Sequence, residues 1–461
     1  MVARDRLNAE LRRNPPHAAA ALAERLGVSA PTLLRMVRER PDDIFRLGST
    51  KNARYALRRP LRGKAAPNPV FRIDTEGRGH EVGTLELAAP SGTVLDLRAW
   101  SWPSPDDNPH GWWDGLPYPL YDMQPQGFIG RNFARAAHGP LGIAPDPKAW
   151  SDDDIVWILS QSGADTPGNL IVGEVAYQKW LTSVATGEAA IAPEALAETY
   201  ARQATAAVSG GIAGSSAAGE FPKFTARREL AGALTPHVIV KFSGADNSAA
   251  VQRWSDLLVC EQLALDALAE FTGLATARSR IIRGAGRAFL ESERFDRIGQ
   301  FGRRSLITLA SLHAALLGTT PTTWPDIAAK MAAKRWLTAA EVERVGTLWW
   351  YGKLIANSDM HLGNLSFHIR DATAGEPSLE LTPAYDMLPM RYAPLSGGEV
   401  PTNNDFSPPL PLPRERERWL IAHKAALNFW QRAGDDQRIS VPFRDICQAN
   451  HITLAPLAIR V

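Results

Sequence analysis

The sequence predicts an α+β protein of two lobes, the C-terminal one mainly helical, behind a separate small N-terminal domain. Two observations support this architecture. At 461 residues the chain exceeds what one hydrophobic core usually serves, and its 45% hydrophobic content is that of a globular protein. Helix and strand patterns alternate after residue 149, and from residue 306 onward the pattern is mostly helical. Predicted helices there cover 305–317, 324–334, 339–357 and 414–433.

The first 64 residues form a basic unit in front of an acidic body. They contain fifteen Lys and Arg against six Asp and Glu, whereas the remaining chain contains 36 against 43. Such a basic region is typical of a surface that contacts nucleic acid. Its pattern predicts a helix over 18–25, a tight turn at Gly27, and a second helix from Ser29, as N-cap, to Arg40. This unit is therefore expected to be a helix-turn-helix.

A β-hairpin is predicted next, which makes the unit a winged helix. Residues 44–59 alternate in two arms around a polar turn over 48–52. The second helix and the wing would meet DNA, and such domains often bind two half-sites as dimers. A helical hairpin that only mediates association is the alternative. The residues predicted to contact DNA are Ser29, Thr32, Arg35, Arg38, Lys51 and Arg54.

The region after this domain is predicted from composition and alternation. Residues 58–69 are rich in Pro and are expected to be a linker. The stretch from Val70 to about Gly139 is expected to be mainly β. Aromatic residues gather from Trp112 to Phe128, and core packing is their expected use. The alternative is a stacking surface for single-stranded nucleic acid.

Asp359, Asn364 and Asp386 carry the pattern of a phosphoryl-transfer site. The reaction requires a carboxylate to orient the acceptor hydroxyl and oxygen ligands to hold Mg²⁺ on the phosphates. The first two residues have the spacing of the protein-kinase catalytic loop, and a later Asp supplies another metal ligand. A surface turn is the alternative, since the loop is rich in turn formers, but apolar residues flank it on both sides. ATP and Mg²⁺ are therefore the expected cofactors.

Other parts expected of a kinase precede this loop. The apolar strand 237–242 contains Lys241, which a buried strand would present to nucleotide phosphates. The alternative is a lysine that reaches solvent. A helix over 256–271 carries Glu261, which is either the partner of Lys241 or part of a solvated face.

Two further segments are expected to contact the nucleotide. Residues 289–297 end a strand and begin a linker, where a hinge would present backbone groups to adenine. Residues 209–224 are rich in Gly, Ala and Ser, and such a backbone can approach phosphates closely. A flexible linker has a similar composition.

Together these motifs resemble the HipA-like serine/threonine kinases of bacterial toxin–antitoxin systems over most of residues 70–440. Typical members pair with a separate DNA-binding antitoxin, whereas here such a domain looks fused to the kinase, as in the YjjJ-type branch. The matching positions are Ser216, Gly219, Pro222 and Lys223 of the small-residue loop, Lys241, the hinge Glu293–Arg297, the loop with Asn357, Asp359, His361 and Asn364, and the element with Tyr385, Asp386 and Pro389.

The resemblance implies a role for each of these residues. Asp359 would be the catalytic base, with His361 in a supporting role. The resemblance also implies that the kinase silences itself by phosphorylating its own loop at Ser216, with Ser215 as the neighbouring alternative. The remaining implied contacts are Asn364 and Asp386 with Mg²⁺, Lys241 and Gly219 with the nucleotide phosphates, and the backbone of Glu293 and Phe295 with adenine.

The expected function is therefore an ATP-dependent protein serine/threonine kinase of toxin type that represses its own operon. Its protein substrate is named only by resemblance, as part of the translation machinery. Gly363 departs from the family, which often carries Lys there, and this puts a phosphate or substrate contact from that position in doubt. One alternative is a DNA-binding transcription regulator whose kinase-like body only senses nucleotide. A nuclease is the other, but it would have no use for Lys241 and the hinge.

Location and domain boundaries complete the prediction. No apolar run approaches the roughly 18 residues that span a bilayer, and the Arg-rich start lacks the apolar segment of a signal peptide, so a cytoplasmic protein is expected. Cys260 and Cys447 fit no metal or disulfide pattern and are expected to be free thiols. The predicted units are 1–64 for the winged helix, 70–240 for the N-terminal kinase lobe, 241–300 for the rest of that lobe and the hinge, and 301–461 for the helical lobe.

Overall fold

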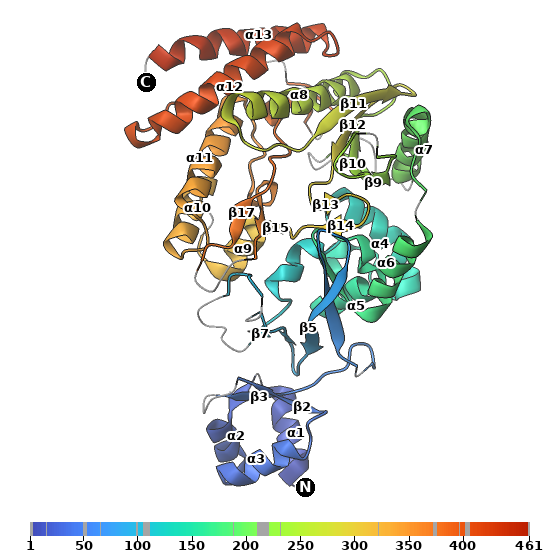
Figure 1. Cartoon of the computed structure of the whole chain (residues 1–461), viewed down its shortest axis with the longest axis vertical. Coiled ribbons are helices and arrows are strands. Elements are labelled where there is room, and N and C mark those ends of the chain that lie inside the picture. The colour runs from blue at the N-terminus through green and yellow to red at the C-terminus, as the bar shows by residue number, and fades with distance from the viewer. Residues whose placement is uncertain are drawn as a thin grey trace.

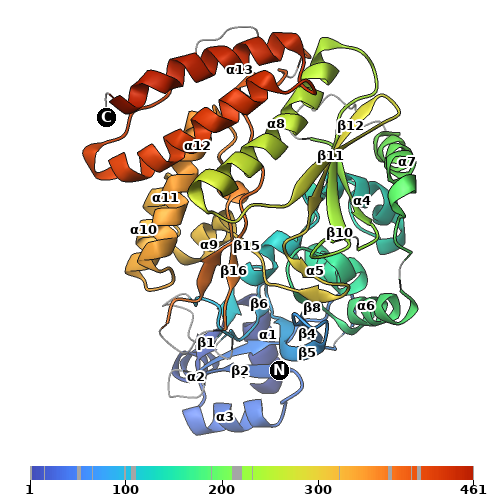
Figure 2. The same ribbon diagram turned by 45° about the horizontal axis from the view of Figure 1, so that its top comes forward.

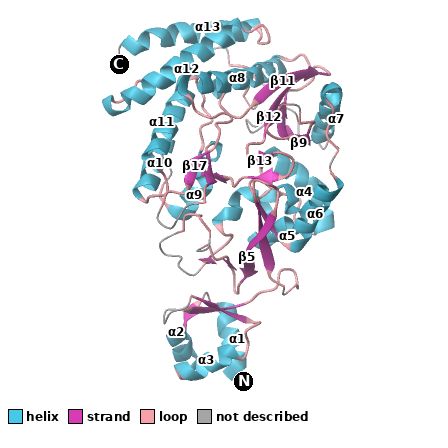
Figure 3. Ribbon diagram, in the orientation of Figure 1, coloured by secondary structure: helices cyan, strands magenta, loops and turns pink. Residues whose placement is uncertain are grey.

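The protein is described from a computed structural model that runs from an N-terminal helical unit to a helical C-terminal layer (Figure 1). Helices and strands are coloured separately in Figure 3. The structure describes residues 3–14, 16–48, 53–64, 66–97, 100–104, 111–187, 189–209, 221–230, 232–320, 322–371, 376–395, 397–401 and 406–459.

The N-terminal unit consists of helices α1 (Ala3–Arg13), α2 (Ala19–Leu26) and α3 (Ala30–Arg38) and a three-stranded sheet. The sheet has the order β1-β3-β2, with β1 at His17–Ala18, β2 at Ile44–Leu47 and β3 at Arg54–Leu57. It lies on the side of the unit that faces the body, and the helices lie beyond it (Figure 1).

The predicted helices and hairpin of this unit are confirmed. Gly27 ends α2 at a φ of 64°, a left-handed conformation that glycine adopts without a Cβ clash. The Ser29 side chain caps α3 by accepting the backbone N–H of Thr32 at 3.4 Å. The sequence did not reveal α1, because Leu7 and Leu11 are its buried apolar side chains and the rest is polar or small.

The middle region is built around a five-stranded sheet of order β7-β6-β5-β4-β8. Its strands are β4 (Asn68–Ile73), β5 (Gly79–Leu87), β6 (Thr93–Val94), β7 (Trp112–Trp113) and β8 (Leu170–Val172). Helices α4 (Gly127–Leu141), α5 (Asp152–Ser162) and α6 (Glu174–Thr186) complete it.

The expectation of mainly β structure up to residue 139 is wrong at its end, because α4 begins at Gly127. The aromatic residues there obscured the helical period. Their use in core packing is confirmed, since Trp113, Tyr118 and Phe128 are buried.

A four-stranded antiparallel sheet follows, in the order β11-β12-β10-β9. Its strands are β9 (Lys223–Arg227), β10 (His237–Phe242), β11 (Ser279–Gly284) and β12 (Arg287–Glu293). Val238, Val240 and Phe242 pack in one core with α7 (Leu196–Val208). Because side chains alternate along a strand, Lys241 points to the opposite face, toward α8 (Ala249–Thr272).

The C-terminal lobe is mainly helical, as predicted, but it also contains a small sheet of order β15-β16-β17. Helix α8 packs along α12, and α12 packs against α11 and α13 (Figure 2). The sequence did not predict α13 or the small sheet. The elements are α9 (Leu309–Leu316), α10 (Trp324–Ala333), α11 (Ala339–Leu354), α12 (Arg416–Asp435), α13 (Val441–Leu454), β13 (Arg297–Ile298), β14 (Gly302–Arg303), β15 (Ile307–Thr308), β16 (Ser366–Ile369) and β17 (Leu379–Leu381).

The N-terminal unit is joined to the body by paired backbone. Arg58, directly after β3, forms an antiparallel bridge with Ala88. The N–H of Ala89 donates to the Leu57 carbonyl at 2.9 Å. The expectation of a free linker over 58–69 is therefore corrected, since its first residues are packed on the body.

Ion pairs strengthen this junction. Three arginines that contribute to the basic charge of the N-terminal unit face carboxylates of the middle region. That charge is therefore divided between the outward surface and the junction. The pairs are Arg58 with Glu86, Arg59 with Asp153 and Arg62 with Asp154.

Two expectations about the environment of the chain can be compared with the structure. Cys260 and Cys447 are free thiols, as predicted, and both are buried. Across the described part of the chain, no helix combines the length and apolar character needed to span a bilayer.

His237, at the start of β10, should make stability depend on pH. Burial, with help from Arg297 and Arg294, lowers its pKa from 6.5 to about 4 and outweighs the hydrogen bond to the Gln300 carbonyl. Stability from the neutral ring is therefore fully present above about pH 6.5 and is lost as pH falls toward 4. Lowering the pH from 7.5 to 5 reduces the free energy of unfolding of the wild-type protein. We predict that the reduction is roughly 2 kcal/mol smaller in His237→Gln. Urea titrations check this, and equal losses would contradict it.

Candidate active site

A buried lysine holds two carboxylates between the four-stranded sheet and the helical lobe. Lys241 Nζ lies 2.7 Å from both Oε1 and Oε2 of Glu261 and also donates to Asp386 Oδ1. Lys241 is 7% exposed and Glu261 is 2% exposed. The predicted pairing of Lys241 with Glu261 is confirmed, and the alternatives of a solvent-reaching lysine and a solvated helix face are excluded.

Burial and ion pairing shift the pKa values of these three residues in opposite directions. Burial alone would lower the pKa of Lys241, but Asp386 and Glu261 outweigh it and hold the lysine charged. Burial raises the pKa of Glu261 to about 6, although Lys241 opposes the rise. Burial also acts to raise the pKa of Asp386, but Lys241 and Lys223 hold it below its usual value.

The loop with Asp359 is tied to this group through Asn357. Asn357 Oδ1 accepts the backbone N–H of Asp359 at 3.0 Å, and Asn357 Nδ2 donates to the Asp386 carbonyl at 3.3 Å. Asn364 Nδ2 donates to the Asp359 carbonyl at 2.8 Å. The Asp359 side chain remains 50% exposed. The structure therefore links the loop of the predicted catalytic base and Asn364 to Asp386, and it leaves the Asp359 carboxylate half exposed.

His361 braces the same loop. Its Nδ1 accepts the N–H of Gly363 at 3.0 Å, so the neutral ring carries its proton on Nε2, which lies 3.9 Å from Asp359 Oδ1. A Cβ on Gly363 would lie 2.9 Å from His361 Cε1. Gly363, which departs from the family pattern, is thus packed against the His361 imidazole. A side chain at position 363 would displace that ring.

Tyr385 connects the loop to the hinge. Its hydroxyl donates to the Gly363 carbonyl at 3.0 Å and lies 2.6 Å from Ser366 Oγ. Its ring packs against Phe295 with centroids 5.5 Å apart. The next residue, Asp386, has a φ of 55°, a left-handed conformation that costs a non-glycine residue about 1–3 kcal/mol. Neighbouring contacts must hold Asp386 in place.

A cavity of about 470 Å³ opens onto these residues. Lys241, Glu261 and Asp386 line it, together with hinge residues 293–296. The N–H of Glu293 donates to the Arg278 carbonyl at 2.9 Å, so the predicted adenine contact cannot use this donor. The volume suits a small-molecule ligand.

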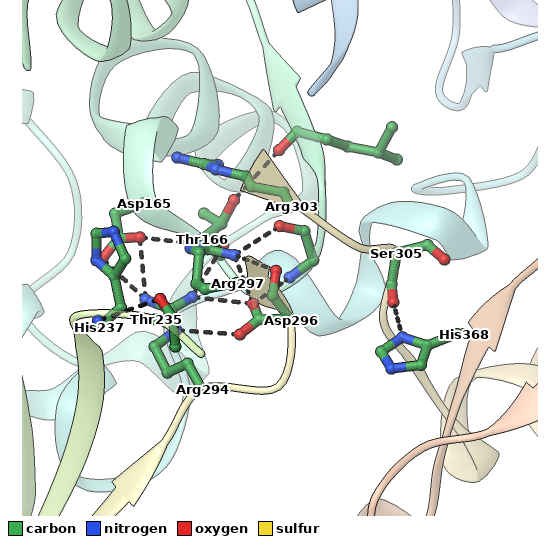
Figure 4. A network of polar contacts seen from close by, with 12 residues as sticks. Asp165, Thr166, Thr235, His237, Arg294, Asp296, Arg297, Arg303, Ser305 and His368 are labelled. Atoms are coloured by element: carbon green, nitrogen blue, oxygen red, sulfur yellow. Dashed lines mark hydrogen bonds and ion pairs between the residues drawn. The ribbon is translucent and has the colours of Figure 1, made fainter. Parts of the chain in front are cut away.

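The charged residues of the hinge face the middle region (Figure 4). Arg294 Nη1 donates to both carboxylate oxygens of Asp165 at 3.0 Å, and Arg297 Nη2 donates to Asp165 Oδ1 at 2.7 Å. Asp296 accepts the N–H of Gly168 at 2.9 Å. Although burial favours the neutral acid, Arg294 and Arg297 keep the pKa of Asp296 well below its usual value. Sequence reasoning missed Asp165, because it lies in a short turn and carries no motif.

The donor set fits magnesium bound with a nucleotide. Mg²⁺ prefers oxygen ligands and takes only one or two protein carboxylates beside substrate phosphates. Asp386 supplies a carboxylate, and Asn364 presents its amide oxygen because its nitrogen is bonded to Asp359. Over the described residues, no cluster of three or more His, Cys, Asp or Glu side chains forms a separate metal centre.

The other predicted site residues lie on the N-terminal unit or outside the description. Arg35 and Arg38 are exposed on α3, and Arg54 is exposed at the start of β3. Ser29 Oγ and Thr32 Oγ1 lie 2.9 Å apart at the start of α3. The residues outside the described part of the chain are Lys51, Ser215, Ser216 and Gly219.

Comparison with known proteins places the chain in a family. Residues 215–452 match the HipA-like C-terminal domain, and residues 64–181 match the middle domain of YjjJ-like toxins. The chain belongs to the HipA-like family.

Within that family it belongs to the YjjJ-type branch. It is 37% identical to Toxin YjjJ of Escherichia coli (strain K12) over 434 residues, which are 94% of each chain. HipA of Shewanella oneidensis MR-1, solved with HipB and operator DNA, shares its fold with a TM-score of 0.52 and 15% identity. That match covers 85% of this chain and 97% of HipA.

Removing the lysine charge should damage both binding and stability. We predict that Lys241→Met weakens nucleotide binding at least tenfold and costs roughly 3–5 kcal/mol of unfolding free energy, because buried Glu261 and partly buried Asp386 are left without their partner. The double variant Lys241→Met with Glu261→Gln should recover part of the stability but none of the binding.

Calorimetric titration with a non-hydrolysable ATP analogue and urea unfolding measure the two effects. Lys179→Met, which removes a lysine from the exposed side of α6, is the control. Nucleotide affinity unchanged in Lys241→Met would remove this lysine from the site.

Proposed function

We propose that the protein is an ATP-dependent protein serine/threonine kinase of toxin type, whose N-terminal unit binds DNA. The observation that carries the proposal is the Lys241–Asp386 pair at a cavity of about 470 Å³, with the loop of Asp359 tied to Asp386 through Asn357. Kinases use a lysine, a metal-binding Asp and a catalytic Asp in this relation.

Each residue then has one task. Lys241 holds the nucleotide phosphates, and Asn364 and Asp386 hold Mg²⁺, which when bound neutralises charge on those phosphates. Asp359 orients the acceptor hydroxyl and accepts its proton as the hydroxyl oxygen bonds to the γ-phosphorus. The bond from that phosphorus to the oxygen of ADP breaks in the same step. His361 keeps the Asp359 loop in shape through Gly363.

The small-residue loop is proposed to deliver its own acceptor. The Lys241 ammonium lies 5.8 Å from the ring centre of Phe221, so the loop ends beside the phosphate site. Ser216 is five residues away and Ser215 six, which places both within about 20 Å of that point along an extended chain. We propose that Ser216, or Ser215 as the alternative, is the acceptor of the γ-phosphate, and that Gly219 approaches the phosphates.

The DNA-binding part rests on the N-terminal unit. We infer a winged helix, in which α3 follows the Gly27 turn and lies on the side away from the body (Figure 1). Helix α3 presents Arg35 and Arg38, and Arg54 lies at the start of β3. The related HipA was solved with HipB and operator DNA, and here one chain would serve both roles. We propose that it represses its own operon, as a dimer on two half-sites.

A nucleotide-sensing regulator is the second candidate. One observation favours it: Gly363 stands where family members often carry Lys. Such a protein would bind ATP and DNA but transfer no phosphate to a protein, whether of the translation machinery or another class.

Asp359 separates the two candidates. We predict that Asp359→Asn abolishes transfer of the γ-phosphate to protein but leaves the affinity for a non-hydrolysable ATP analogue within about twofold, because Asp359 is half exposed and unpaired with Lys241. Radiolabel transfer and calorimetry measure these two effects. Asp371→Asn, which removes an 86% exposed carboxylate, is the matched control. Transfer that persists in Asp359→Asn would refute the assigned base.

Arg35 tests the DNA-binding part. We predict that Arg35→Ala lowers affinity for duplex DNA and reduces the slope of log affinity against log salt concentration by about 1, while kinase activity is kept. Arg202→Ala is the control, because Arg202 is also an exposed helical arginine but lies on α7 of the body. Fluorescence anisotropy over a salt series measures the slope. Equal slopes in wild type and Arg35→Ala would place the DNA surface elsewhere.

A further inference from the structure

Two arginines of the junction are fixed to the first turn of α5. Arg59 is bidentate to Asp153, with Nη2 2.8 Å from Oδ1 and Nη1 bonded to Oδ2. Arg62 pairs with Asp154, and its Nη1 donates to the Leu141 carbonyl at 2.7 Å. Both arginines follow β3 by a few residues, and the Arg59 N–H donates to the Leu87 carbonyl of β5 at 2.9 Å, so this segment links the end of the wing to the body.

The opposite end of α5 forms part of the nucleotide cavity. Ile158, Leu159 and Ser162 line the same 470 Å³ cavity as Lys241. The turn that follows α5 carries Asp165, whose carboxylate bonds Arg294 and Arg297 behind the hinge (Figure 4). A helix of 11 residues is about 16 Å long, so α5 spans the distance from the junction to the hinge.

Helix α5 is a closely packed element with a capped first turn. Its first turn is closed by a capping box, in which Ser151 Oγ accepts the Asp154 N–H at 3.2 Å and Asp154 Oδ2 accepts the Ser151 N–H at 3.0 Å. Val156 and Leu159 are fully buried. Close packing transmits a displacement instead of absorbing it. Asp154 serves both the cap and Arg62, so a shift of the arginine acts directly on the helix end.

The backbone pairing at the junction limits independent motion of the N-terminal unit. Leu57 and Arg58 are hydrogen-bonded or bridged to residues 88–89 of the body. The Arg58 guanidinium lies 4.9 Å from the ring centre of Phe45 in the wing and is paired with Glu86 of β5. A change in the wing therefore reaches the body through residues 57–62.

We propose that DNA bound at the N-terminal unit changes the affinity of the cavity for nucleotide, and that the Arg59–Asp153 and Arg62–Asp154 pairs and α5 transmit the change. The proposal rests on the proposed function, since it needs both ligands to bind. Coupling between two sites is reciprocal, so nucleotide must change DNA affinity by the same factor.

The full-length protein is titrated with a fluorescent non-hydrolysable ATP analogue and Mg²⁺, with and without a saturating mixed-sequence duplex of about 30 base pairs. The duplex is titrated with and without the analogue. We expect the affinity to change at least fivefold, by equal factors in both titrations. If both ligands bind but neither changes the affinity for the other by more than twofold, this inference is overturned and the proposed function is not. Failure to bind the duplex would overturn the DNA-binding proposal and this inference together.

Charge variants at the junction test the route. Arg59→Gln and Asp153→Asn should each bring the coupling factor to within twofold of one, while the affinity for each ligand alone stays within twofold of wild type. Exchanging the charges, with Arg59→Asp and Asp153→Arg in one chain, should restore most of the coupling.

The control removes an ion pair of the same kind from the body. Arg202→Gln breaks the exposed pair with Glu198 and should leave the coupling unchanged. The Arg59–Asp153 pair is also partly exposed, so its loss should leave the fold intact, and the thermal midpoint of each variant checks this. If Asp153→Asn keeps the wild-type coupling factor between DNA and nucleotide, and its thermal midpoint is unchanged, the route through α5 is overturned.

Discussion

The buried ion group of Lys241, Glu261 and Asp386 constrains the rest of the body. Each charge taken from water costs several kcal/mol, and the cost is offset only if the partners are held together. They come from three segments: β10, α8 and the stretch of chain that follows β17. The sheet must therefore present Lys241 on the face opposite α7, and α8 must place Glu261 beneath it. Asp386 completes the group from a left-handed backbone conformation that only its neighbours can maintain.

A second set of charges fixes the hinge to the middle region. Arg294, Asp296 and Arg297 are buried, and Asp165 of the turn after α5 pairs with both arginines. The charged residues of the hinge motif are thus used for placement, whereas Phe295 packs on Tyr385 beside the cavity. This division explains why the middle region, and not only the two lobes of the kinase-like part, forms a wall of the cavity.

Much of the site could be predicted because its residues lie in short stretches with strong local signals. The strand with Lys241 is apolar, the Asp359 loop has a defined spacing, and Ser29 is an N-cap at the start of an amphipathic helix. Contacts between distant segments carried no such signal. Asp165 meets Arg294 across 129 residues, and Asp153 meets Arg59 across 94. Helix α1 was missed because its apolar face holds only two leucines. Residues 58–69 were predicted to be a linker because a proline-rich composition does not reveal that the first of them pack on the body.

The proposed function requires that this site transfer phosphate to a protein hydroxyl. The most direct measurement is phosphosite mapping by mass spectrometry of the purified protein before and after incubation with Mg-ATP, with Asp359→Ala prepared in parallel. The account predicts new phosphate on a serine of the small-residue loop, at Ser216 or Ser215, that is absent from the variant. ATP bound by the wild-type protein with no phosphate gained on any residue would contradict it and favour a regulator that only senses nucleotide.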